Sequence, residues 1–220
     1  MVELITGLRA EDVRANLERA RSEIARVGRN PDEVQILAAV KYVPAEELGV
    51  LSDAGLELLG ENRAQDLEAK ADAYPGRFTW DFIGHLQSRK VKQILPYVRH
   101  IQTVASDSAL EQLRRHGTPQ TEILVEVNVA GEAGKSGIAP AELPDFLERS
   151  PVNVVGLMTM PPLAPDPEDS RRHFAALREL AGEHGLTQLS MGTSQDYLVA
   201  VQEGATIVRL GTSLYRSGAS

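Results

Sequence analysis

The stretch TQLSMGTSQDYLVAVQEGATIVRLGTS (187–213) contains two short runs of strand-forming residues, 187–192 and 206–213, with a helical pattern between them. Parallel strands cannot be joined by a tight hairpin loop and need a longer crossover connection, which is usually a helix. Two strands with a helix between them in sequence are therefore expected to pair in parallel. Each such repeat is one βα unit of a parallel sheet. This stretch therefore predicts that the chain ends in two parallel strands with a helix packed outside them.

The same alternation extends back through the rest of the chain. The predicted strands are 34–41, 56–62, 78–84, 100–106, 121–129, 152–160, 187–192 and 206–213, and the predicted helices are 10–27, 45–53, 63–72, 87–95, 108–116, 140–149, 168–183 and 195–203. Eight strands with helices between them can close a (β/α)8 barrel. The alternative, an open doubly wound sheet, usually has a glycine-rich turn after its first strand, and VKYVPAEE (40–47) contains no glycine. We expect an α/β fold, a single (β/α)8 TIM barrel over residues 1–220 with an extra N-terminal helix.

Composition limits the chemistry of the chain. Its 220 residues are 42% hydrophobic, carry a formal net charge of −8 and include no cysteine, which excludes disulfides and thiolate metal sites. The acidic balance disfavours binding to nucleic acid or to anionic membranes, and no apolar run is long enough to span a bilayer. The histidines show no metal-ligand spacing, so we expect no metal site. The opening residues do not form a secretory signal, which predicts a cytoplasmic protein.

Polar residues at the carboxyl ends of the predicted strands are the candidate functional groups, since these ends form the active face of such barrels. Lys41 follows the apolar run ILAAV, so its side chain must reach a polar group or lose its hydration. Desolvation would expose a free amine of the kind that forms Schiff bases. The alternatives are a lysine that extends to the barrel rim and one that pairs with Glu61.

The loops after the last two predicted strands both combine glycine with hydroxyl side chains. Gly192, Thr193 and Ser194 precede a helix, and residues 211–213 read GTS. Barrels often bind phosphate with these loops, helped by the helix dipole. The simpler interpretation is that Ser194 only caps the following helix. Arg209 lies inside the last strand, where its charge requires either a structural ion pair or an acceptor on a ligand.

Several longer motifs resemble one protein family. They are AAVKYVP (38–44), LGENRAQDLEAK (59–70), WDFIGHLQSRKVK (80–92), EVNVAGEAGKSGI (126–138), VVGLMTMPPL (154–163) and LSMGTSQDYLVAVQEGATIVRLGTSLY (189–215). In order and content they resemble the pyridoxal 5′-phosphate homeostasis proteins. That family often has a residue other than Asp81 in WDFIG, and MGMS where this chain has MGTS.

The resemblance implies a barrel similar to the N-terminal domain of alanine racemase, with pyridoxal 5′-phosphate (PLP) bound as an internal aldimine. It makes Lys41 the Schiff-base residue and places Arg209 against the pyridine nitrogen. The implied cofactor-binding set is Lys41, Asn62, Met191, Gly192, Ser194, Arg209, Gly211 and Thr212, with Ser194, Gly211 and Thr212 on the phosphate.

An arginine against the ring nitrogen disfavours carbanion chemistry, because a guanidinium cannot accept the proton that makes the ring a strong electron sink. The family comparison implies that alanine racemases use two bases, one from a second domain and a second subunit. Only Tyr215–Ser220 follow the last strand here, so we expect that domain to be absent. We therefore expect no catalytic residue, and a monomeric carrier or regulator for vitamin B6 homeostasis, with apo PLP-enzymes as candidate recipients. The alternative is a monomeric PLP-dependent enzyme such as a weak amino-acid racemase.

Overall fold

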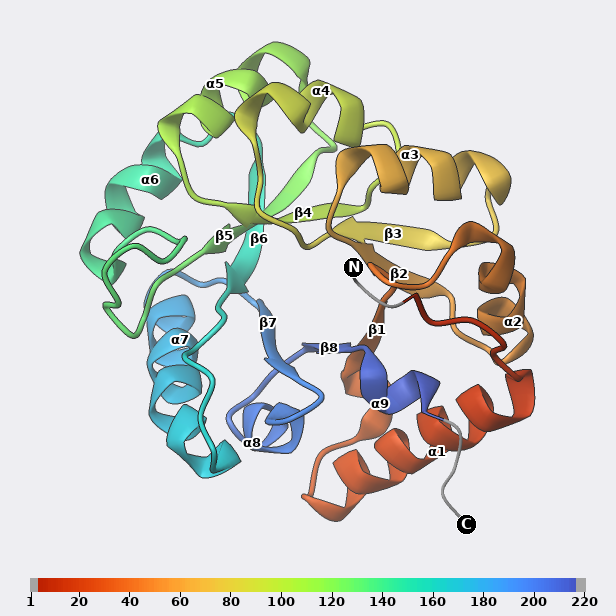
Figure 1. The fold of residues 1–220 in the computed structure, drawn as a ribbon. Helices are drawn as coiled ribbons and strands as arrows, with labels where there is room; N and C mark the ends of the chain where they lie inside the picture. Colours follow the sequence, from red (N-terminus) through yellow and green to blue (C-terminus); the bar gives the residue numbers. More distant parts are fainter. Residues whose placement is uncertain (1–3, 217–220) are drawn as a thin grey trace.

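The computed structural model describes residues 4–216 and confirms the predicted (β/α)8 barrel. Its eight parallel strands are hydrogen-bonded in chain order and close into a barrel, which Figure 1 shows with the helices arranged outside the strands. The strands are β1 (Gln35–Ala39), β2 (Leu58–Glu61), β3 (Thr79–Phe82), β4 (His100–Val104), β5 (Glu122–Glu126), β6 (Asn153–Met158), β7 (Gln188–Thr193) and β8 (Ile207–Leu210).

Eight of the helices in the described residues lie in the predicted intervals to within one residue, and the ninth, Thr212–Tyr215, begins where the last strand was predicted to continue. The helices are α1 (Ala10–Arg26), α2 (Leu48–Asp53), α3 (Ala64–Ala73), α4 (Val91–Ile94), α5 (Asp107–His116), α6 (Leu143–Arg149), α7 (Arg171–Glu183), α8 (Tyr197–Gln202) and α9 (Thr212–Tyr215). Short 3-10 turns are η1 (Pro31–Glu33), η2 (Ala45–Glu47), η3 (Ser88–Lys90), η4 (Pro140–Glu142) and η5 (Pro167–Ser170). Several predicted helices therefore begin with a 3-10 turn. No helix within residues 4–216 combines the length and the apolar character that crossing a membrane requires.

The barrel closes through the pairing of β1 with β8. Leu37 is in register with Arg209, and Ala38 with Leu210. Since all strands are parallel, their carboxyl ends meet at one mouth of the barrel. The first and the last strand are thus neighbours there, although they lie far apart in sequence.

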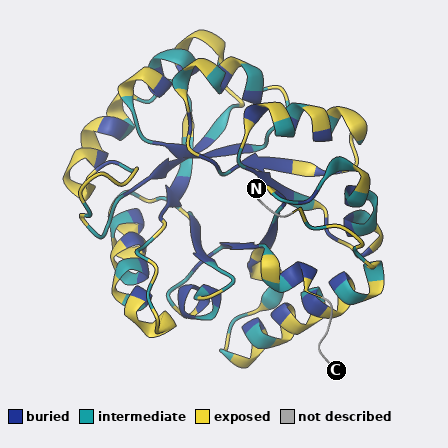
Figure 2. Cartoon of the chain, in the orientation of Figure 1, coloured by how far each residue is buried: buried dark blue, intermediate teal, exposed yellow. Residues whose placement is uncertain are grey.

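The extra N-terminal helix completes the outer layer. One face of α1 is buried through Val13, Ala20 and Ile24, and the buried Asn16 amide donates to the carbonyl oxygens of Leu214 (3.0 Å) and Arg216 (2.8 Å). Figure 1 shows α1 beside α9, and Figure 2 shows buried residues concentrated in the strands and exposed ones on the outer helix surfaces. Helix α1 therefore ties the two ends of the described chain together.

The last predicted strand ends three residues earlier than expected. Residues 211–213 were predicted as the end of the last strand, but β8 stops at Leu210 and α9 begins at Thr212. Gly211 has φ −125° and ψ −96°, which turns the backbone out of the strand direction. The GTS motif consequently forms a turn at the mouth of the barrel.

Gly192 fixes the turn from β7 to α8. Its φ is +90°, and a Cβ at this position would lie 2.6 Å from Cβ of Ala200. We expect Gly192→Ala to lower the free energy of unfolding by about 2 kcal/mol, because it adds both backbone strain and overpacking. Urea denaturation measures this change. The matched control is Gly182→Ala in α7, where a Cβ meets open space and helix propensity predicts a gain of about 0.5–1 kcal/mol. Equal effects of the two substitutions would contradict this role of Gly192.

Candidate functional site

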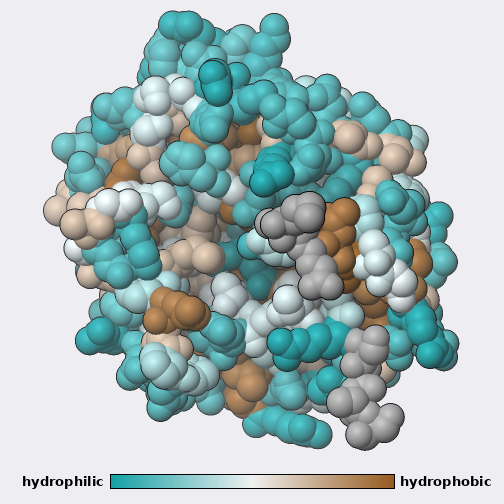
Figure 3. Space-filling model, viewed as in Figure 1, coloured by the Kyte–Doolittle hydropathy of each residue, from teal (hydrophilic) through white to brown (hydrophobic). Residues whose placement is uncertain are grey.

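A cavity of about 340 Å³ lies among the carboxyl ends of the strands. It is lined by Ile5, Ala39, Lys41, Tyr42, Asn62, Ile83, Met160, Thr193, Ser194, Gln195, Arg209, Gly211, Thr212 and Tyr215. We call it the Lys41 cavity. The face of the molecule in Figure 3 is hollowed near its centre, over the ring of strands seen in Figure 1. The fold thus brings six predicted site residues to one space: Lys41, Asn62, Ser194, Arg209, Gly211 and Thr212.

The remaining predicted site residues, Met191 and Gly192, do not line the Lys41 cavity. Met191 is fully buried in the hydrophobic core. Gly192 packs against Ala200 and Tyr197 of α8. In this segment of the chain, the first residue that lines the cavity is Thr193, directly after Gly192.

Lys41 follows β1 and is exposed, so the expected loss of hydration is not seen in this structure. Its ammonium nitrogen lies 4.6 Å from the centre of the Tyr42 ring, within the range of a cation–π contact. The alternative of a pair with Glu61 is wrong, because Glu61 bonds to Lys70. The geometry therefore favours the other alternative, in which the Lys41 side chain extends to the rim of the barrel.

Glu61 and Lys70 form a buried ion pair behind Lys41. The Lys70 ammonium donates to Oε2 of Glu61 (2.5 Å) and to the carbonyl oxygen of Val40 (2.7 Å). The other Glu61 oxygen accepts from the backbone N–H of Asn62 (2.6 Å). One pair therefore holds the backbone next to Lys41 and the backbone of Asn62 in place. The Asn62 Oδ1 atom is itself buried and has no hydrogen-bond partner.

The two loops after β7 and β8 contact each other through Ser194. Its hydroxyl accepts from the backbone N–H of Gly211 (3.2 Å) and lies 2.9 Å from the hydroxyl of Ser213. The alternative in which Ser194 caps α8 is wrong, since the residue at the cap position is Asp196. The Asp196 carboxylate accepts from the backbone N–H of Thr193 (2.7 Å). The hydroxyl and amide groups of both loops consequently gather on one side of the Lys41 cavity.

Arg209 is buried, and its partners are neutral. One terminal nitrogen donates to the Ser190 hydroxyl (2.6 Å) and the other to the carbonyl oxygen of Thr159 (2.9 Å). No carboxylate within residues 4–216 lies at salt-bridge distance, so the alternative of a structural ion pair is wrong. Burial lowers the pKa of Arg209 to about 10, although the charges of Asp196 and Glu126 oppose this shift. The side chain therefore remains a cation at neutral pH.

A chain of hydrogen bonds continues from Arg209 through the barrel interior. The Ser190 hydroxyl donates to Oε1 of Gln102 (2.6 Å), and the Gln102 amide donates to Asp81 (2.7 Å). Arg99 donates to the same Asp81 carboxylate (2.7 Å). Because β4 and β7 are not neighbouring strands, the bond between Ser190 and Gln102 must cross the barrel. The Asp81 carboxylate is thus the acceptor at the far end of the chain of hydrogen bonds that orients Arg209.

Two tyrosines that were not predicted as site residues also line the Lys41 cavity. Tyr42 lies under the Lys41 ammonium. The Tyr215 hydroxyl donates to the carbonyl oxygen of Ala39 (3.2 Å). Burial, with a smaller contribution from the Glu61 carboxylate, holds the pKa of Tyr215 well above its usual range. The position of Tyr42 directly after Lys41 was an available signal, whereas Tyr215 reaches the site only because β8 pairs with β1.

Comparisons with known proteins agree with this architecture. The family model for the alanine racemase N-terminal domain matches residues 9–218. A pyridoxal phosphate homeostasis protein of Aquifex aeolicus is 38% identical over 213 residues, which are 90% of this chain and 93% of that protein. The corresponding protein of Pseudomonas aeruginosa is 37% identical over 218 residues, which are 94% of this chain and 94% of that protein.

Solved structures extend the comparison. PipY of Synechococcus elongatus, in its form with PLP bound, is 31% identical with a TM-score of 0.79, over 93% of this chain and 100% of PipY. Alanine racemase of Clostridium difficile is 13% identical with a TM-score of 0.71, over 97% of this chain and 58% of the racemase, and this likeness concerns the fold alone. The class of protein is therefore an alanine racemase N-terminal-domain barrel. Within that class, the chain belongs to the pyridoxal phosphate homeostasis proteins, as its motifs predict.

The buried pair behind Lys41 is testable through stability. We expect Lys70→Met to lower the free energy of unfolding by about 3–5 kcal/mol, because it leaves the Glu61 carboxylate buried without its cation. Arg77→Met is the control, since Arg77 pairs with Asp53 on the surface and its loss should cost less than about 1 kcal/mol. Urea denaturation at neutral pH compares the two variants. A Lys70→Met variant as stable as Arg77→Met would contradict the supporting role of the pair.

Proposed function

We propose that the protein binds PLP in the Lys41 cavity and holds it for intracellular vitamin B6 homeostasis, without turning over amino acids. The relatives of the chain are named for PLP homeostasis, and PipY has been solved with PLP bound. The observation that carries the proposal is that an exposed amine, two hydroxyl-bearing loops and a buried arginine line one cavity. Its volume of about 340 Å³ lies within the range of small-ligand sites.

The residues present fit this cofactor. When bound, PLP supplies an aldehyde that condenses with a primary amine and a ring that withdraws electrons. Lys41 offers a primary amine that has no carboxylate partner within residues 4–216 and only the Tyr42 ring against it. In this proposal Lys41 is the residue of attachment, and the unpartnered Oδ1 of Asn62 lies beside the ring.

The loops after β7 and β8 are the proposed phosphate site. The Ser194 hydroxyl and the turn at Gly211 and Thr212 present short polar groups without a bulky side chain between them. Groups of this kind hold phosphate oxygens in many barrels. Met191 and Gly192 contribute indirectly in this proposal, since the core position of Met191 and the turn at Gly192 set the path of the loop that carries Ser194.

Arg209 is the proposed neighbour of the ring nitrogen. A guanidinium has five N–H donors, and the bonds to Ser190 and Thr159 use two of them, so donors remain for a ligand. Arg209 can donate a hydrogen bond to that nitrogen but cannot accept its proton. The ring then lacks the positive charge that stabilises a carbanion, which favours holding the cofactor over turnover.

The lining of the Lys41 cavity offers few groups for proton transfer. The described lining residues include no aspartate, glutamate or histidine. Besides Lys41, the titratable groups are Arg209, Tyr42 and Tyr215. Tyr215 is held protonated, and its hydroxyl donates a hydrogen bond to the carbonyl oxygen of Ala39. A racemase needs a second base opposite the first, and this set supports a holder better than an enzyme.

We extend the proposal to the setting of the protein. We propose a monomer that forms a single PLP-binding domain over residues 1–220, and the family model that spans residues 9–218 supports the single domain. Residues 1–3 and 217–220 lie outside the described structure. The proposed location is the cytoplasm, and apo PLP-enzymes are the proposed recipients of the cofactor.

Lys41 is the residue whose substitution tests the proposal. With PLP added, we expect the unaltered chain to acquire the visible absorbance of a protein-bound cofactor and, after borohydride reduction, one modified peptide containing Lys41. Lys41→Ala should lose both signals, because no other amine among residues 4–216 lines the cavity. Lys92→Ala, which removes an exposed lysine from α4, should retain both. Absorbance spectra and peptide mass mapping give the result. Unchanged labelling of Lys41→Ala, or labelling of a different lysine, would overturn the assignment.

A further inference from the structure

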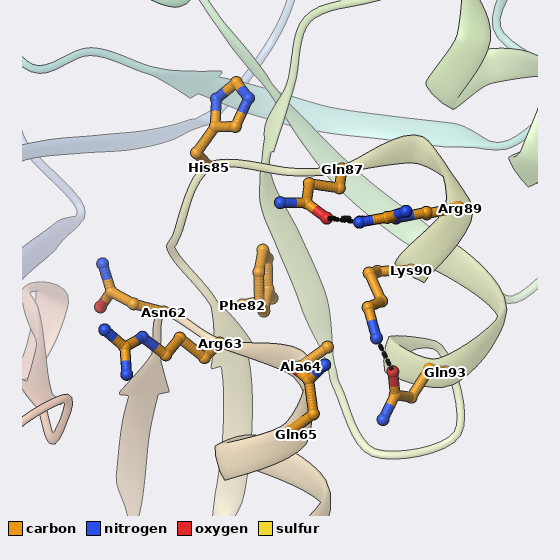
Figure 4. Close-up of a pocket in the computed structure, with 10 residues that line it drawn as sticks. All are labelled: Asn62, Arg63, Ala64, Gln65, Phe82, His85, Gln87, Arg89, Lys90 and Gln93. Atoms are coloured by element: carbon orange, nitrogen blue, oxygen red, sulfur yellow. Dashed lines mark hydrogen bonds between the residues drawn. The ribbon is translucent and has the colours of Figure 1, made fainter.

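A second cavity lies beside the Lys41 cavity, over the ends of β2 and β3. It has a volume of about 610 Å³ and is lined by Asn62, Arg63, Ala64, Gln65, Phe82, His85, Gln87, Arg89, Lys90 and Gln93 (Figure 4). We call it the Arg63 groove. Its residues come from the loop between β2 and α3, from the end of β3 and from η3 and α4. In the view of Figure 4, Arg63 lies on one side of the Phe82 ring, and Arg89 and Lys90 lie on the other.

The Arg63 groove collects positive charge that the protein does not neutralise. Arg89 donates only to the neutral Gln87 amide (3.2 Å), and Lys90 donates to Gln93 (3.0 Å). Among residues 4–216, none of Arg63, Arg89 and Lys90 forms a salt bridge, and no carboxylate lines the groove. Three cations around one cavity repel each other in a chain whose net charge is −8. An anion in the groove would relieve this repulsion.

Backbone and amide donors add to the cations. Helix α3 begins at Ala64, Arg63 occupies its cap position, and no side chain caps the helix there. The first N–H groups of α3 therefore have no acceptor within the helix. The amides of Gln65 and Gln87 also line the groove. Oxyanions are bound by this combination of guanidinium, ammonium and amide donors.

The charge of the groove favours a phosphate group over a single carboxylate. A phosphate monoester carries a charge of about −2 at neutral pH and accepts through three oxygens, whereas a carboxylate carries one charge. The volume of about 610 Å³ leaves room for the organic part of a small molecule, and Phe82 is part of the wall of the groove. The groove thus has the size and the donors for a phosphorylated metabolite.

We propose that the Arg63 groove binds a phosphate-bearing small molecule at a site separate from the loops of Ser194 and Thr212. The Lys41 cavity and the groove share Asn62, whereas the hydroxyl loops belong to β7 and β8. A ligand in the groove therefore lies next to the amine end of the first site. Phosphate binding in the groove does not depend on PLP binding at Lys41.

An NMR titration of the full chain with inorganic phosphate tests this site. We expect saturable shifts of the backbone amides of Ala64 and Gln65, which do not appear when chloride is added at equal ionic strength. Arg63→Gln and Arg89→Gln should each raise the dissociation constant for phosphate, measured at these amides, about tenfold. Each substitution removes one charge-assisted hydrogen bond to the phosphate. The amides of Gly211 and Thr212 report separately on the loops of the first site.

Two controls distinguish the groove from general charge effects. Arg114→Gln removes an exposed arginine of α5 that pairs with Glu111, and it should leave the titration unchanged. Ser194→Ala should alter the shifts of Gly211 and leave those of Ala64 unchanged. Shifts that follow ionic strength alone, or an Arg63→Gln variant that binds phosphate as tightly as the unaltered chain, would overturn the proposal. An acidic peptide that shifts Ala64 when phosphate does not would also overturn it.

Discussion

The pairing of β1 with β8 is the interaction on which the site depends. It closes the barrel and sets Leu37 opposite Arg209 and Ala38 opposite Leu210. The chain leaves β1 toward Lys41 and leaves β8 toward Gly211, so the amine and the loop at Gly211 end on the same rim. An open sheet with the same strands would separate these groups by its full width. Closure of the barrel therefore creates the Lys41 cavity from the two ends of the sequence.

The barrel interior is more polar than a purely structural barrel requires. Interiors of this fold are usually filled with layers of branched apolar side chains. Here Arg209, Ser190, Gln102 and Asp81 form a continuous chain of hydrogen bonds across the interior. Buried polar chains of this kind are favourable only when every member is satisfied. The chain fixes the Arg209 guanidinium in one orientation, which suits a residue that faces a ligand rather than one that only fills space.

The repeat pattern was sufficient to predict the fold, because alternating strands and helices admit few closed arrangements. Lys41, Ser194, Arg209 and the GTS motif were predictable as a group, since each follows or lies in a strand that ends at the mouth. The register of the strands and the burial of individual side chains were not predictable, and they determine the remaining contacts around the site. Lys70 lies in an ordinary helical pattern, yet it takes the Glu61 partner that Lys41 might have used. The Arg63 groove combines segments of two loops whose distance apart is set only by the fold.

We propose that this barrel holds PLP through Lys41 and that the described lining of the Lys41 cavity lacks the second proton-transfer group that turnover needs. The PLP-loaded chain, incubated with L-alanine and separately with D-alanine in deuterated water, tests this claim most directly. NMR would follow the Cα proton of each enantiomer against a control containing free PLP. We expect exchange no faster than in that control. Exchange at ordinary enzyme rates of about 1 to 1000 per second would contradict the proposal and would make the protein a PLP-dependent enzyme.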